Sequence, residues 1–144
     1  MLVGHDALRS VDHGGFQCQT HAWLDGRADV AGLSAALNHL ARLHPVVTSR
    51  LEISQDVAAW HCVGEASPVL HESTLPAAAP SGVWRFGASL CEIPLDHDRD
   101  PPISFHLLHL PDGRDVFIIK YGHALMDGKS PEFVLSRIHE CYEQ

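Results

Sequence analysis

The amino-acid sequence predicts an α/β domain in which helices cover a sheet. Residues 16–24 alternate between two unlike sets of side chains, which is the period of a strand with two different faces. Residues 117–119 are apolar in succession, which is typical of a strand buried on both faces. Residues 30–40 and 134–142 repeat apolar side chains at helical spacing. A chain of 144 residues suffices for one domain with a substantial core.

The first half of the chain predicts a strand, a helix and a hairpin. Asp29 is suited to cap a helix because its carboxylate accepts from the free amides of the first turn. The helix carries one apolar stripe, formed by Val30, Leu33, Leu37 and Leu40. Pro45 forces the residue before it out of helical geometry, so the helix ends near His44. Residues 46–53 and 57–63 are prone to form strands, and the Ser-Gln-Asp between them favours an antiparallel hairpin.

The second half predicts a loop, a second hairpin and a closing helix. Residues 75–82 contain the prolines and small residues of a surface loop. Residues 103–110 and 115–121 flank Pro-Asp-Gly-Arg, a strong signal for a hairpin turn. Ser130 is expected to cap the last helix, with Pro131 in its first turn. The inward stripe of this helix is expected to contain Val134, Ile138 and Tyr142.

Composition narrows the classes of function. A net charge of -8 with neutral histidines argues against binding to nucleic acid, because phosphates require a cluster of positive side chains. Any anionic ligand would therefore need a local positive region on this acidic chain. No apolar run approaches the ~20 residues that cross a bilayer, and no leader peptide is evident, so a cytoplasmic protein without membrane insertion is expected. Cys18, Cys62, Cys91 and Cys141 are widely spaced and expected to be free thiols. His106 and His109 face opposite ways on a strand, so no metal site is expected.

The best candidate for chemistry is His123. It follows the apolar strand in the segment Tyr-Gly-His-Ala-Leu-Met-Asp-Gly, residues 121–128, just before the last helix. Side chains at the end of a rigid strand are held well, and an imidazole accepts protons near neutral pH. Asp127 is placed to orient the imidazole or to brace the loop, and Gly128 permits backbone geometry that other residues resist.

This His-x-x-x-Asp-Gly segment resembles the signature of the chloramphenicol acetyltransferase and condensation-domain superfamily. Flanking segments are similar to the same family in the same order. Residues 42–51 resemble its helix-to-strand segment, and residues 93–107, followed by Pro-Asp-Gly, resemble the approach to the signature. The similarity extends from about residue 16 onward.

The resemblance implies a fold and a reaction. The fold is a two-layer α/β sandwich lobe with a mixed or mostly antiparallel sheet, and residues 1–144 form a single N-terminal lobe without the second lobe. His123 is the implied general base, and the implied reaction moves an acyl group from acyl-CoA or a phosphopantetheine thioester to an alcohol or amine. No tightly bound cofactor is implied. Asp127 and Gly128 support the loop, Asp127 by pairing with an arginine. A carrier protein, second lobe or second subunit is the expected partner.

Three departures from the family leave other functions open. Gly122 stands where most condensation domains have the first of two histidines, and Thr48 stands where many have an arginine, for which Arg50 is a possible substitute. The implied second lobe is also absent. The alternatives to an acyltransferase are a non-catalytic condensation-like binding or scaffold module, and an N-terminal fragment of a larger two-lobe enzyme.

Overall fold

A computed structural model describes most of the chain: residues 2–4, 10–12, 15–54, 57–62, 66–96, 99–123, 126 and 129–143. Its helices are α1 (Val30–Leu43), the short 3-10 helix η1 (Pro45–Thr48), α2 (Pro80–Glu92) and α3 (Ser130–Tyr142). Its strands are β1 (Leu2–Gly4), β2 (Ser10–Asp12), β3 (Gly15–Trp23), β4 (Arg50–Ser54), β5 (Val57–His61), β6 (Leu70–Thr74), β7 (Ile103–His109) and β8 (Asp115–Gly122).

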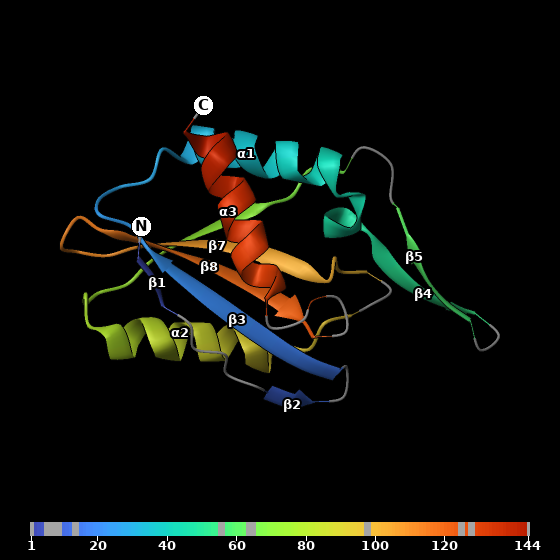
Figure 1. The fold of residues 1–144 in the computed structure, drawn as a ribbon. Coiled ribbons are helices and arrows are strands. Elements are labelled where there is room, and N and C mark those ends of the chain that lie inside the picture. The colour runs from blue at the N-terminus through green and yellow to red at the C-terminus, as the bar shows by residue number, and fades with distance from the viewer. Residues whose placement is uncertain are drawn as a thin grey trace.

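The main sheet is mixed. Its order is β1-β3-β8-β7-β6, and β2 pairs with the other end of β3. The pairs β3–β8 and β7–β8 are antiparallel, whereas β6 and β7 run parallel and are connected through α2. Strands β4 and β5 form a separate antiparallel hairpin that extends away from the sheet (Figure 1). Both predicted hairpins, including the turn with Gly113 at φ +86°, are confirmed in their pairing. The predicted strand over residues 46–53 starts too early, because Pro45 begins the short helix η1 and β4 starts only at Arg50.

Helices cover both faces of the sheet. Alternate residues of β8 point to opposite faces. Phe117 and Ile119 join the core beneath α1 and α3, whereas Val116 and Ile118 join a smaller core beneath α2 (Figure 1). All of β8 is buried, as the apolar run predicts. The predicted class, a mixed sheet packed by helices, is confirmed, and α2 adds a third layer to the predicted two.

The starts of α1, α2 and α3 agree with the sequence-based predictions in one case and differ from them in two. Asp29 caps α1 by accepting from the Ala31 amide at 3.1 Å, as predicted. Lys129, not Ser130, is the N-cap of α3, and no side chain of a described residue makes a capping bond there. Residues 80–82 were expected in a loop but begin α2, because proline is well tolerated in the first turn of a helix.

A glycine allows α2 to approach β3 closely. A Cβ atom on Gly87 would collide with the side-chain oxygen of Gln19 and would lie 2.8 Å from His21 Nε2. Gln19 and His21 are themselves buried and bonded to each other at 2.7 Å. This face of β3 therefore carries polar groups against a helix, although most buried faces of sheets are apolar.

A charged network ties the start of β8 to two neighbouring segments. The fully buried carboxylate of Asp115 accepts from Arg27 Nη1 at 2.7 Å and from the Ala28 amide at 2.9 Å. His109 Nδ1 lies 2.9 Å from the same carboxylate, and His109 Nε2 lies 3.0 Å from Glu72. Hydrogen bonds to Glu72 and Asp115 raise the pKa of His109. Burial alone would raise the pKa of Asp115, but bonds from Ala28, Arg27 and His109 lower it below its usual value.

These two shifts predict how stability depends on pH. The contribution of His109 is complete below its unfolded pKa of about 6.5 and is lost as the pH rises through the higher folded value. The contribution of Asp115 is complete above about pH 4 and is lost as the pH falls through its lowered folded value. We therefore expect His109→Gln to lose less stability than wild type as the pH rises above about 6.5, measured as urea midpoints. Identical pH profiles for wild type and variant would contradict this assignment.

Candidate functional site

His123 lies in a turn directly after β8, and its side chain is exposed. No described residue forms a hydrogen bond or an ion pair with its imidazole. The ring is therefore accessible to a substrate, as a general base requires. Asp127 and Gly128, the other predicted site residues, lie outside the described residues.

The strand that carries His123 is firmly held. Gly122 pairs with Gln17 of β3, and its amide donates to the Pro102 carbonyl at 2.9 Å. Tyr121 is buried and lies opposite Ile103 of β7. Because β8 is flanked on both sides, the backbone at position 122 is fixed in place, and the imidazole extends from a rigid support.

Met126 anchors the far side of the signature loop. Its side chain is buried and belongs to the core beneath α1 and α3. It also lines a cavity of about 200 Å³ together with Leu40, His44 and Phe133, which we call the helix cavity. The rings of His44 and Phe133 meet edge to face there, with centroids 5.9 Å apart. His44 thus packs against Phe133 at the end of α1.

A second cavity adjoins Gly122. It has a volume of about 270 Å³ and is lined by Lys120, Ser104, His71, Arg50 and Leu95, among others. We call it the lysine cavity. Leu95 Cδ1 lies 3.4 Å from where a Cβ atom on Gly122 would stand, so the cavity reaches the end of β8. His123 itself lines neither the helix cavity nor the lysine cavity.

Gly122 stands where the signature that this segment resembles has a histidine, and the residues around it show how much room a side chain would have. A Cβ atom there would meet only Leu95 Cδ1 at 3.4 Å and the Pro102 carbonyl at 3.9 Å, which are ordinary contacts. We therefore expect Gly122→Ala to keep stability or raise it by up to about 1 kcal/mol, because alanine restricts the unfolded chain.

A larger side chain at the same position provides the matched comparison. Gly122→His would press against Leu95 and should cost about 1–3 kcal/mol through overpacking. Urea unfolding of both variants measures the difference. Equal midpoints for alanine and histidine would contradict the role of Leu95.

The predicted substitute brace, Arg50, and its neighbour Thr48 occupy different environments. Arg50 is exposed at the start of β4 and lines the lysine cavity. Thr48 is buried, and its hydroxyl donates to the Pro45 carbonyl at 3.3 Å. Since Asp127 lies outside the described residues, a pairing with Arg50 stays a prediction.

Lys120 is a polar residue whose position the sequence analysis did not single out. It is 6% exposed within β8, and its Nζ donates to the Ile93 carbonyl at 3.0 Å. Burial lowers its pKa, and the nearby Cys91 and Asp100 partly oppose that effect. One signal was present in the sequence, because a lysine directly follows three apolar residues of a strand predicted to be buried on both faces.

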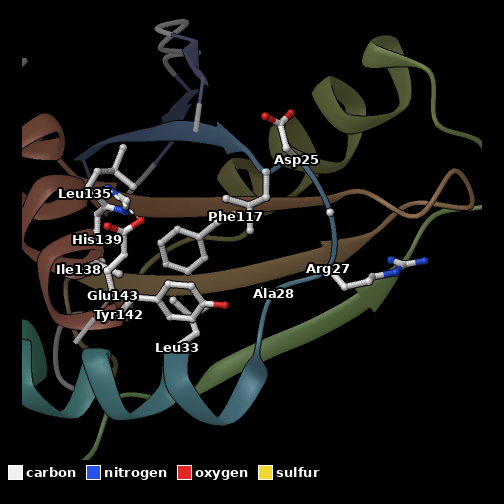
Figure 2. Close-up of a pocket in the computed structure, with 12 residues that line it drawn as sticks. Asp25, Arg27, Ala28, Leu33, Phe117, Leu135, Ile138, His139, Tyr142 and Glu143 are labelled. Atoms are coloured by element: carbon white, nitrogen blue, oxygen red, sulfur yellow. Dashed lines mark ion pairs between the residues drawn. The ribbon is translucent and has the colours of Figure 1, made fainter.

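A third cavity lies at the opposite end of β8. It has a volume of about 250 Å³, and Phe117, Leu33, Ile138 and Tyr142 line it (Figure 2). The Tyr142 hydroxyl accepts from the Asp29 amide at 2.6 Å. This bond joins the start of α1 to the end of α3 at the wall of the cavity. Phe117 lies near the beginning of the strand and His123 follows its end, so this cavity is remote from the predicted base.

The cysteines and the helices can be compared with the predictions made from composition. None of the four cysteines, all of which lie in the part of the chain that the structure describes, forms a disulfide, and burial raises the pKa of Cys91 to about 11. Cys141 is partly buried and packs against the core beneath α1 and α3. Within the described residues, no helix combines the length and apolar character that crossing a bilayer requires.

Comparisons with known proteins find similarity in fold. No protein-family model and no curated protein matches the chain. The X-domain from teicoplanin biosynthesis is similar at 23% identity and a TM-score of 0.76, over 89% of this chain and 28% of that chain. The starter condensation domain of the rhizomide synthetase RzmA is similar at 17% identity and a TM-score of 0.75, over 88% of this chain and 31% of that chain. The first condensation domain of the CDA synthetase is similar at 20% identity and a TM-score of 0.73, over 88% of this chain and 33% of that chain.

These similarities agree with the resemblance seen in the sequence. The chain has a condensation-domain-like fold, in which a mixed sheet packs against helices. It spans about a third of the length of the solved structures it matches.

Proposed function

We propose that this chain acts as one lobe of a condensation-type acyltransferase with His123 as its general base. The donor is an acyl thioester of CoA or of a carrier protein, and the acceptor is an alcohol or an amine. The observation that carries the proposal is the exposed imidazole of His123 at the end of a buried strand, in a fold shared with condensation domains. No resident cofactor and no metal takes part.

The chemistry needs one proton acceptor and one set of oxyanion donors. His123 removes the proton from the acceptor hydroxyl or amine as that oxygen or nitrogen attacks the thioester carbonyl carbon. The tetrahedral intermediate carries a negative oxygen, which fixed hydrogen-bond donors must stabilise. The carbon–sulfur bond then breaks, and the departing thiolate receives the proton that His123 had accepted. No acyl-enzyme is required.

The loop between His123 and α3 supports this role. Asp127 holds the loop by pairing with an arginine, for which Arg50 is our candidate, and Gly128 permits the turn into the helix. Burial of Met126 provides a second point of attachment. Because the solved relatives are about three times longer, the complete site includes a second lobe or a second subunit.

A second candidate function is a binding module without chemistry. One similar structure is a complex of the X-domain and OxyB from teicoplanin biosynthesis, with a TM-score of 0.72 and 22% identity. A lobe of this fold can therefore be part of a protein that binds another protein. Gly122, in place of a family histidine, also fits such a module.

An acceptor-dependent assay separates the two functions. The full natural polypeptide is incubated with acyl-CoA or an acylated carrier protein and with candidate alcohols and amines. Released thiol is measured with a chromogenic disulfide, and the acylated product is identified by mass spectrometry. Thiol release that depends on the acceptor and matches product formation supports the transferase. Saturable binding of the thioester or carrier protein in calorimetry, without product, supports the binding module instead.

A further inference from the structure

The lysine cavity contains more positive than negative groups, although the chain as a whole is acidic. Among the described residues, its lining includes the cations Lys120 and Arg50, the imidazole of His71 and one carboxylate, Asp100. The Asp100 carboxylate already accepts from the Asp96 amide at 3.2 Å. The chain has a net charge of -8, so this cavity is a local region of positive charge of the kind that an anionic ligand requires.

Lys120 lies on the face of the sheet that α2 covers. It pairs with Gln19 of β3 on one side and with Ser104 of β7 on the other. Ile93, whose carbonyl accepts from Lys120 Nζ, ends α2 and also lines the cavity. The bond between them therefore lies at the cavity wall, at the end of a helix whose carbonyls attract a cation.

The ammonium of Lys120 is incompletely compensated. An ammonium has three donors, and the bond to Ile93 uses one of them. No carboxylate among the described residues forms an ion pair with Lys120. The neighbouring Cys91 stays a neutral thiol at ordinary pH because burial raises its pKa to about 11. Asp100 acts on Lys120 from across the cavity but forms no ion pair with it, so a bound anion in contact with Nζ would stabilise this buried charge further.

Polar groups beside Lys120 are arranged around the same space. Ser104 Oγ lies 2.9 Å from His106 Nε2, and the rings of His106 and His71 stack with centroids 5.0 Å apart. Burial, then the nearby His71 and Lys120, lower the pKa of His106 to about 4, so it is neutral near pH 7. His106 adds no charge, and the Ser104 hydroxyl, which lines the cavity, can donate to an oxyanion when His106 Nε2 carries the ring proton and donates to Ser104 Oγ.

Apart from Thr48 and Ser67, the remaining lining is apolar. Val47, Leu95, Ile103 and Phe105 contribute hydrocarbon surface next to the polar groups. A volume of about 270 Å³ is far more than the ~10–15 Å³ that a single water needs. A cavity with a cationic end and apolar walls suits a molecule with one oxyanion and a short hydrocarbon body.

We propose that the lysine cavity binds a small organic anion, with a carboxylate or phosphate oxygen accepting from Lys120 Nζ. The hydrocarbon body lies against Leu95 and Phe105. This site is separate from the proposed role of His123 as a base, since binding needs no acyl transfer. It adjoins the strand end through Leu95, which lies next to Gly122.

Calorimetric titration of the chain tests the proposal with four probes: butanoate, acetate, butyl phosphate and neutral butanamide. We expect at least one anion with a four-carbon body to bind at least tenfold more tightly than butanamide. The comparison of butanoate with butyl phosphate identifies the head group, and the comparison with acetate tests the apolar walls. Binding of butanamide as tight as that of both four-carbon anions, or no binding of any anion, would overturn the proposal.

Matched variants test the role of the lysine. Lys120→Met keeps most of the side-chain volume and removes the charge, and it should weaken anion binding at least tenfold. Arg85→Met removes the same charge from an exposed position on α2 outside the cavity lining and should leave binding unchanged. A folded Lys120→Met protein with wild-type affinity would refute the site. If that variant does not fold, the NMR shift of Lys120 Cε in wild type decides, because it must move with the tightest anion and not with butanamide.

Discussion

His123→Ala is expected to lower kcat for acyl transfer by about 100- to 10,000-fold, the usual contribution of a positioned general base. The alanine variant retains the fold and the cavities but cannot accept the proton of the attacking hydroxyl or amine. The ring is exposed and makes no bond to a described residue, so its removal should change the unfolding midpoint little. Steady-state thiol release, measured beside a urea unfolding curve, separates lost chemistry from lost structure.

Two comparisons sharpen this experiment. His139→Ala removes another exposed histidine, which faces Glu143 at 3.5 Å at the other end of the molecule, and should keep wild-type kcat (Figure 2). Free imidazole added to His123→Ala should restore part of the rate, because it replaces the missing proton acceptor. Wild-type turnover by a folded His123→Ala protein would exclude this residue as the base.

Asp115→Asn is expected to lower the free energy of unfolding by about 3 kcal/mol. The carboxylate is fully buried and accepts from Arg27, Ala28 and His109. Asparagine has similar size but no charge, so the Arg27 guanidinium loses its counter-ion and His109 loses one of its two acidic partners. The low end of the usual 3–5 kcal/mol range applies because Arg27 is half exposed and can turn toward water.

This loss is measurable by heat or by urea. For a domain of this size, about 3 kcal/mol corresponds to a decrease of roughly 6–12 °C in Tm. Asp112→Asn makes the same chemical change in the exposed pair of Asp112 and Arg114, where solvent screens the interaction, and should shift Tm far less. Equal shifts for the two variants would show that the buried network does not contribute as described.

Much of the fold was predictable because its signals are local. Alternation over residues 16–24, the capped stripe of α1 and the Pro-Asp-Gly turn each depend on a few neighbouring residues, and the structure confirms all three. Helix α2 was missed because its signals are mixed. Pro80 and the small residues before it resemble a loop, and Gly82 and Gly87 weaken the helical pattern.

The candidate site was predictable in part. Motif and strand together locate His123, and the structure agrees that it follows a buried strand and is exposed. The lysine cavity was not predictable, because its lining residues come from segments as distant as residues 47 and 120. The place of Lys120 in an apolar strand was the one local signal, and spacing along the chain does not show which distant residues meet it.

By itself, the sequence determined the strands β3, β7 and β8, the helices α1 and α3, the hairpin of β4 and β5, and the position of one imidazole after a strand. Only the tertiary structure decided the order of strands, the third layer formed by α2 and the burial of Lys120 against the end of that helix. The physical reason is range. Periodicity and turn chemistry act between residues a few positions apart, whereas strand pairing and burial depend on which distant segments exclude water from one another.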